Sequence, residues 1–168
     1  LMTTSRDSHI GGREAILGIP YDAKDVPAGN YSGIVRLGGN RYALVSDKAE
    51  QGGYFIFNID IDDKGNVTSV KNRGFRQLES KNIDEEAIAY DKENHNIYIG
   101  KEKTSEIVRY NILDGRKNCS TVVDDYRDYG YSNRTIESLT YDERRLSVVT
   151  INEGPLRGDN GLMLRLME

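Results

Sequence analysis

The chain has few of the residues on which many active sites depend. Its 168 residues include one cysteine, two histidines, three prolines and no tryptophan. A single cysteine excludes a disulfide within the chain and a zinc site built from spaced cysteines. Only His9 and His95 could serve a Ser-His-Asp triad, and His95 lies in a predicted turn, so such a triad is hard to assemble.

Long apolar runs and basic clusters are also missing. No run reaches the roughly 18 apolar residues of a membrane-spanning helix, and the first residues lack the apolar core of a signal peptide. Acidic residues outnumber basic ones, 27 to 23, which gives a net charge of -4. Nucleic-acid-binding proteins usually carry a basic patch, so we expect no nucleic-acid partner and no membrane span.

A pattern of short runs occurs three times in the chain. Each run has four to eight residues rich in Val, Ile, Tyr and Phe, and Gly, Asn and Asp separate the runs, which indicates β-strands and turns. The first runs begin 54 and 51 residues apart, and the second runs end in acids 55 and 51 residues apart. The three first runs are Ser32–Leu37, Glu86–Tyr90 and Glu137–Tyr141, and the acids are Asp47, Glu102 and Glu153.

These repeats predict an all-β protein made of β-propeller blades. In the first unit, for example, the second run is at 41–47, and a polar turn at 62–66 leads into residues 67–71, which could supply a fourth strand. A unit of about 50 residues with four antiparallel strands has the size of one blade. We expect an N-terminal segment at 1–26 that could supply a closing strand, then blades at 27–80, 81–131 and 132–168, the last incomplete. Propellers usually close with about four to eight blades, so either these three are half of a ring in a longer chain or two copies complete one ring.

The repeat brings acidic residues together. In an antiparallel pair the start of the first strand lies beside the end of the second, and the first strand of a blade lines the central channel. Six positions should therefore gather at one channel mouth. One is Ser32, and the other five are acidic: Asp47, Glu86, Glu102, Glu137 and Glu153. Asp84, just before the second of these first runs, adds another carboxylate.

A ring of carboxylates repels itself unless a cation, basic neighbours or raised pKa values relieve it. Carboxylate oxygens suit Ca²⁺ or Mg²⁺ better than zinc or copper, so we predict metal ligation by Asp47, Asp84, Glu86, Glu102, Glu137 and Glu153. Basic residues lie close in sequence, including Lys101 and Arg134, and we expect Lys48, Lys103 and Arg157 to bind an anionic substrate such as a phosphate ester. Alternatively, the acids cap turns or pair with lysines on a solvated rim.

Several motifs resemble the phytase-like family, which is described by an esterase-like activity of phytase and occurs in exported proteins of Bacteroides-type bacteria. They are NYSGI, VSDK, DEEAIAY and ESLTY, with the downstream pair Asn152-Glu153. The resemblance implies a six-bladed propeller of roughly twice this length, of which this chain is similar to the N-terminal half, exported to the periplasm or cell surface. The family's acidic motif residues fall on Asp47, Asp84, Glu86, Glu137 and Glu153.

The chain departs from the family pattern at two positions. Ala87 stands where the family usually has glycine, and Asn152-Glu153 replaces a Thr-Glu pair. Neither change removes a carboxylate. Because β-propeller phytases bind several Ca²⁺ ions at an acidic channel mouth, the resemblance in fold and rim character leads us to expect Ca²⁺ as the cofactor.

The leading functional hypothesis is a metal-dependent hydrolase, phytase-like or esterase-like, with Glu86 and Glu137 as catalytic carboxylates. The alternative is a non-catalytic propeller that binds a ligand or a protein at its acidic mouth. A third hypothesis is a scaffold with no small-molecule site. Hydrolysis of aryl phosphates or aryl esters, with and without Ca²⁺, distinguishes the first hypothesis from the others.

Overall fold

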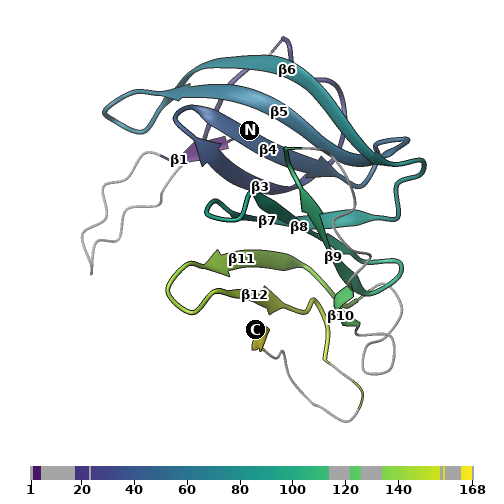
Figure 1. Cartoon of the computed structure of the whole chain (residues 1–168). Coiled ribbons are helices and arrows are strands. Elements are labelled where there is room, and N and C mark those ends of the chain that lie inside the picture. Colours follow the sequence, from purple (N-terminus) through teal and green to yellow (C-terminus); the bar gives the residue numbers. More distant parts are fainter. Residues whose placement is uncertain are drawn as a thin grey trace.

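The computed structural model describes residues 2–4, 18–22, 24–113, 122–125, 134–155, 157 and 164–167 (Figure 1). Within these residues the chain forms strands and turns and no helix, so none of them forms a helix that could cross a membrane. The prediction of an all-β fold is confirmed. His9 and Cys119 lie outside the described residues.

The first blade is a four-stranded antiparallel meander. Its strands run in the order β3 (Tyr31–Gly38), β4 (Arg41–Ser46), β5 (Gly52–Ile61) and β6 (Val67–Glu79). In β3, half-buried and exposed residues alternate, as expected for a strand with one face toward the core. The sequence places the fourth strand at 67–71, whereas β6 continues to Glu79 because it follows β5 along its whole length through three irregularities in register.

The second blade has the same order, with β7 (Glu85–Asp91), β8 (Asn96–Lys101), β9 (Glu106–Asn111) and β10 (Val122–Asp125). The third has three strands, β11 (Ser138–Asp142), β12 (Ser147–Ile151) and β13 (Leu164–Met167). At the N-terminus β1 (Met2–Thr4) pairs with β2 (Gly18–Pro20) in a sheet of their own. A closing role for residues 1–26 stays a prediction.

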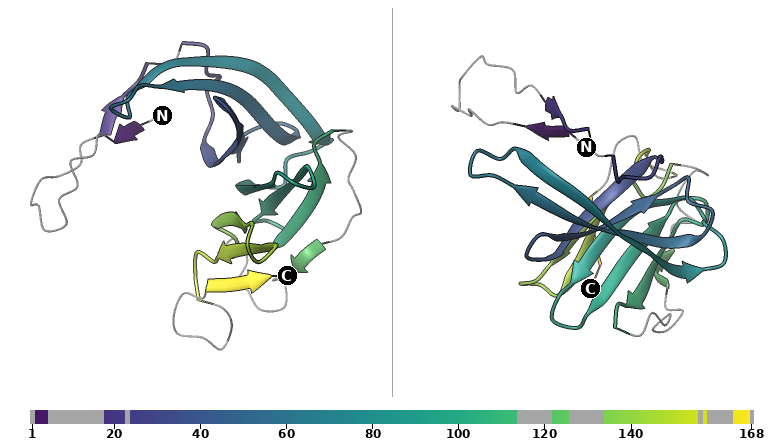
Figure 2. Two further views of the ribbon diagram at one scale, coloured as in Figure 1. Left: turned by 60° about the vertical axis from the view of Figure 1, so that its left-hand side comes forward. Right: turned by 90° about the horizontal axis from the view of Figure 1, so that it is seen from above.

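The three blades follow one another in an arc, as the left view of Figure 2 shows. Their first strands are neighbours: β3 contacts β7, and β7 contacts β11. Two apolar clusters lie between the blades, and a third, which includes Leu44 and Phe57, belongs to blade 1. The junction of blades 1 and 2 buries an apolar cluster that includes Val45, Ile88 and Ile99, and the junction of blades 2 and 3 buries one that includes Ile136 and Leu139.

Two glycines permit this close packing around Ala87. A Cβ atom on Gly33 would lie 3.1 Å from the Ala87 Cα, and a Cβ atom on Gly100 would lie 3.2 Å from the Ala87 Cβ and 2.6 Å from the Ile136 Cγ2. Ala87 itself is 2% exposed. Glycine at positions 33 and 100 thus allows the strands to pack closely on both sides of Ala87.

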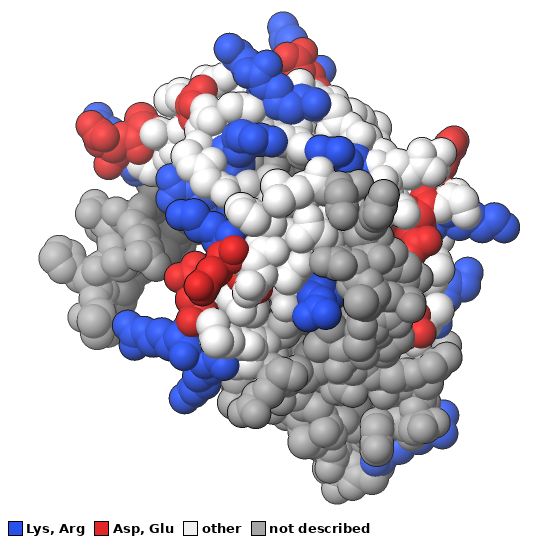
Figure 3. Space-filling view, viewed as in Figure 1, with Lys and Arg blue, Asp and Glu red and all other residues white. Residues whose placement is uncertain are grey.

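Charged side chains are dispersed over the surface. On the face seen in Figure 3, acidic and basic side chains are interspersed among neutral ones over the described part of the chain. With a net charge of only -4, the electrostatic character of a site depends on its immediate neighbours, because screening limits exposed charges to a range of about 10 Å.

Candidate functional site

The acidic end of blade 2 is shaped by an irregularity at the start of β7. Glu85 pairs with Lys101 and Ala87 pairs with Gly100, so Glu86 is the extra residue of a β-bulge. Asp84, just before the strand, has a φ of 58°, which aspartate tolerates better than most residues. Its carbonyl oxygen accepts a hydrogen bond from the Glu102 backbone N–H at 2.8 Å.

Blade 3 has an equivalent connection. The Glu153 N–H donates to the Thr135 carbonyl oxygen at 3.2 Å, and the Glu137 N–H donates to the Ile151 carbonyl oxygen at 3.0 Å. In both blades the segment before the first strand is therefore bonded to the end of the second strand. This explains why the acids at these two places lie close together in space.

The six acids predicted as ligands form two groups of three. The first acid triad is Asp47, Asp84 and Glu86, and the second acid triad is Glu102, Glu137 and Glu153. Within each triad one carboxylate oxygen from each residue lies within 4.8 Å of the others. Each triad bridges two blades, since Asp47 comes from blade 1 and Glu102 from blade 2. The sequence predicts one ring of acids, and the structure places two triads at successive blade junctions.

The two triads interact electrostatically through Glu102. This residue is 8% exposed. Burial, followed by the negative charges of Glu86, Glu153, Asp84 and Glu137, raises the pKa of Glu102 to about 7. Burial, and then Glu153 and Glu86, also raise the pKa of Glu137 above its usual range. Part of the second triad is therefore protonated near neutral pH unless a positive charge is added.

Lysines surround the first triad. A pocket of about 570 Å³ beside it is lined by three acids and three lysines: Asp47, Glu50, Asp84, Lys48, Lys81 and Lys103. Lys48 forms an ion pair with the Asp47 Oδ2 at 2.9 Å, and its hydrogen bond and charge interaction with Asp47 raise the pKa of Lys48.

Of the predicted substrate-binding residues, Lys48 and Lys103 thus lie at the same pocket. Arg157 is exposed and is not among the described residues that line it. Lys81 is not among the residues predicted from the sequence, because it follows β6 and a strand expected to end at 71 gives no reason to place residue 81 beside the acids.

One atom of the first triad lacks a partner. The Asp47 Oδ1 is buried and has no hydrogen-bond partner in the described part of the chain. A buried carboxylate oxygen without a partner is costly, and a cation bound by the triad would satisfy it. The donor set, three carboxylates with no sulfur or nitrogen, fits a hard cation such as Ca²⁺.

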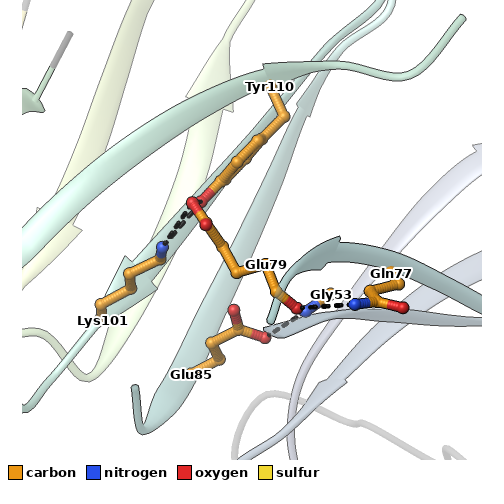
Figure 4. Close-up of polar contacts among 6 residues, drawn as sticks. All are labelled: Gly53, Gln77, Glu79, Glu85, Lys101 and Tyr110. Carbon is orange, nitrogen blue, oxygen red and sulfur yellow. Dashed lines mark hydrogen bonds and ion pairs between the residues drawn. The ribbon is translucent and has the colours of Figure 1, made fainter. Parts of the chain in front are cut away.

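A second group of charged residues, absent as a group from the sequence predictions, lies at the junction of blades 1 and 2 (Figure 4). Glu85 is 1% exposed, and its Oε2 accepts a hydrogen bond from the Gly53 N–H of blade 1 at 2.9 Å. Burial raises the pKa of Glu85 to about 7. The signal in the sequence is the pair of adjacent acids Glu85 and Glu86, but the bulge interrupts the regular alternation of the strand at this point.

Lys101 belongs to this second group and not to the acid triads. The sequence places it beside Glu102, yet its side chain is 3% exposed and lies 3.6 Å from the Glu79 Oε1 of blade 1. Its Nζ donates to the Tyr110 hydroxyl at 2.7 Å, and that hydroxyl donates to the Glu79 Oε1 at 3.0 Å. We call Glu79, Glu85, Lys101 and Tyr110 the inter-blade network, because they join blade 1 to blade 2.

Comparison with known proteins gives one match. A family model described as "Phytase-like: Esterase-like activity of phytase" matches residues 26–168. No curated protein and no solved structure matches the chain.

Proposed function

The chain belongs to the phytase-like family, and on this basis we propose that its two acid triads form the active site of a metal-dependent hydrolase of phosphate esters. The observation that carries the proposal is the position of the triads. Each gathers three carboxylates from two blades, and the first adjoins a pocket with three lysines. Carboxylates for a cation and lysines for an anion are together what a phosphate ester requires.

Both triads offer oxygen ligands to Ca²⁺. Asp47, Asp84 and Glu86 would hold one ion, and the second acid triad, defined above, would hold another. The chemistry that bound Ca²⁺ supplies is polarisation of a phosphoryl oxygen and a lower pKa for a bound water. The unpartnered Asp47 Oδ1 and the mutual repulsion at Glu102 both favour a bound cation.

The side chains of the chain itself supply charge and a proton acceptor. Lys48, Lys81 and Lys103 border one pocket, where their ammonium groups would neutralise and orient a phosphate group. We assign to the Glu137 carboxylate, which lies in the second acid triad beside Glu153, the acceptance of a proton from an attacking water. Glu86 lies in the first triad and acts on Glu137 electrostatically, so the two predicted catalytic carboxylates belong to one charged system.

The test is hydrolysis of p-nitrophenyl phosphate and p-nitrophenyl acetate by the whole chain in Ca²⁺ and in EGTA. We expect Ca²⁺-dependent release of p-nitrophenol from the phosphate, and its loss in a Glu86→Gln/Glu137→Gln variant. The control is Asp63→Asn/Glu143→Gln, which removes two exposed acids outside the triads. Turnover that survives in the Glu86→Gln/Glu137→Gln variant, or in EGTA, would contradict the proposed mechanism.

One observation favours a non-catalytic alternative. The 2.9 Å ion pair of Lys48 with Asp47 neutralises part of the first triad without a metal, as would suit a surface that only binds an anionic ligand. In that case phosphate monoesters bind in EGTA, calorimetry detects the binding, and neither substrate is hydrolysed. Loss of that binding in Lys48→Met, with no turnover in the wild type, would support the binding module over the hydrolase.

A further inference from the structure

A second pocket lies at the opposite end of the sheets from the acid triads, and the proposed function does not use it. Its volume is about 500 Å³, and its described lining includes Asp91, Asn96, Tyr98 and Arg109 of blade 2 and Tyr141 of blade 3. Strand β8 starts at Asn96 and ends next to Glu102. At about 3.3 Å per residue, the two ends are roughly 17–20 Å apart, so this pocket is separate from the acidic end.

Two polar atoms at this pocket are buried without a partner. Asn96 is 8% exposed, and among the described residues neither its Oδ1 nor the Nε of Arg109 has a hydrogen-bond partner. The first atom is an acceptor and the second is a donor. Buried polar groups are normally paired, and an unpaired one destabilises the fold. A ligand that offers both a hydrogen-bond donor and an acceptor would complement the two atoms.

The repeat shows that the fold does not require polar residues here. In blade 2, Tyr98 pairs with Arg109 across β8 and β9, and in blade 1 the equivalent pair across β4 and β5 is Ala43 with Ile56. Ala43 and Ile56 both belong to the apolar cluster between blades 1 and 2. The same positions can therefore be filled by an apolar junction, and blade 2 has an arginine and a tyrosine instead.

The distribution of charge in the pocket favours a neutral ligand. The Asp91 carboxylate already accepts hydrogen bonds from Asn94, from the backbone N–H at 3.1 Å and from the side-chain amide at 2.8 Å. The acceptor that lacks a partner in the described part of the chain is the amide oxygen of Asn96. Because this oxygen carries no net charge, it favours a cationic ligand little more than a neutral donor. Asp91 also lies in the same lining as Arg109 and offsets part of its charge, which weakens the case for an anion.

Aromatic rings form another part of the lining. Tyr98 and Tyr141 stack with their ring centroids 5.8 Å apart and their planes 13° apart, one ring from each blade. Each hydroxyl group of a carbohydrate can both donate and accept a hydrogen bond, and the C–H faces of a sugar ring can pack against aromatic side chains of a protein. We propose that this pocket binds a small neutral saccharide.

The test uses the whole chain and two methods, saturation-transfer-difference NMR and isothermal titration calorimetry. The probes are D-glucose, D-galactose, D-mannose and maltose, with glycine and inorganic phosphate as charged comparison ligands. We expect at least one of the sugars to bind with a millimolar dissociation constant, as is usual for ligands with so few atoms, and neither charged ligand to bind at this pocket.

Two variants remove the unpaired atoms. Arg109→Ile introduces the residue that blade 1 has at the equivalent position, and Asn96→Leu keeps a similar volume without the polar group. Each should weaken sugar binding by about tenfold or more, while the urea midpoint of Asn96→Leu stays the same or rises because an unpaired buried group is removed. The control is Arg73→Ile, which removes an exposed arginine of blade 1, and it should bind sugar like the wild type.

Three results would overturn the proposal. The first is that no probe sugar binds the wild type, which is the result expected if the unpaired atoms bind only a water molecule. The second is that sugar binds equally well to the wild type and to either folded pocket variant. The third is that glycine or phosphate binds and competes with the sugar in a manner sensitive to Arg109→Ile, because the ligand class would then be charged. If one variant does not fold, the other gives the same decision.

Discussion

Replacing Tyr110 by Phe tests the inter-blade network most directly. The Tyr110 hydroxyl accepts a hydrogen bond from the Lys101 Nζ at 2.7 Å and donates one to the Glu79 Oε1 at 3.0 Å. Phenylalanine should fit, because the equivalent position of blade 1 is Phe57, which is 0% exposed. The substitution therefore removes one hydroxyl group and little else.

The expected magnitude follows from the partners of that hydroxyl. Hydrogen bonds to charged groups contribute about 1.5–3 kcal/mol each, so losing two would cost about 3–6 kcal/mol if nothing replaced them. Lys101 is 3% exposed and keeps Glu79 at 3.6 Å, so part of the interaction persists. We therefore expect the free energy of unfolding to fall by about 2–4 kcal/mol.

The assay is urea unfolding followed by far-UV circular dichroism, analysed by linear extrapolation. The control is Tyr42→Phe in β4, a half-buried tyrosine whose hydroxyl has no hydrogen bond among the described residues. A Tyr110→Phe variant within about 0.5 kcal/mol of the wild type, the usual range for surface substitutions, would refute the network. A Lys101→Met substitution added to Tyr110→Phe should have a non-additive effect, because the two side chains share one interaction.

Two further predictions concern the blade junctions. The folded-state pKa of Glu85, about 7 against an ordinary 4.5, means that the folded protein binds more protons at this residue between these values, so the contribution of Glu85 to stability is fully present below pH 4.5 and is lost as the pH rises through 7. Glu85→Gln keeps an acceptor for Gly53 and should lose this slope, giving a higher urea midpoint than the wild type at pH 8 in EGTA; equal midpoints at pH 8 would argue against the burial effect. Gly100→Ala places a methyl group 2.6 Å from the Ile136 Cγ2 and should destabilise by about 1–3 kcal/mol, and an unchanged thermal midpoint would show that the junction can relax.

The strands and their order could be predicted because the information is local. The run predicted at 41–47 corresponds to β4 at Arg41–Ser46, and the polar turn at 62–66 is a hairpin in which the Asp62 carboxylate accepts the N–H groups of Lys64 and Asn66. Alternation, β-branched residues and turn residues specify these features without help from the rest of the chain. The exposed residues 71–74 of β6 carry no such pattern. The sequence therefore does not predict that the pairing of β6 with β5 continues to Glu79.

The convergence of the acids could be predicted, but their division into triads could not. Antiparallel pairing alone brings Glu137 close to Glu153, and both belong to the second acid triad. Glu86 belongs to the triad of Asp47 and not to that of Glu102, and this grouping depends on the bulge at Glu86 and on the distance between neighbouring blades. Neither is encoded in a short segment, because both arise from contacts between distant parts of the chain.

The buried charges could not be predicted for a related reason. A sequence shows that Glu85 and Glu86 are adjacent, but it does not reveal that Gly53 lies across the junction from Glu85, or Glu79 across it from Lys101. Lys101 was expected near the acids at the rim on the basis of its neighbour Glu102. The direction of its side chain is decided by the partner that blade 1 provides.

The packing of Ala87 between Gly33 and Gly100 limits which residues can be exchanged at this junction. A Cβ atom on residue 33 would meet the Ile88 backbone nitrogen and the Val45 Cγ2, each at 3.0 Å, and a Cβ atom on residue 100 would meet the Ile136 Cγ2 at 2.6 Å. None of these atoms belongs to the methyl group of Ala87, so the contacts would remain if residue 87 were glycine. Residue 87 can therefore alternate between glycine and alanine without releasing either neighbour from glycine.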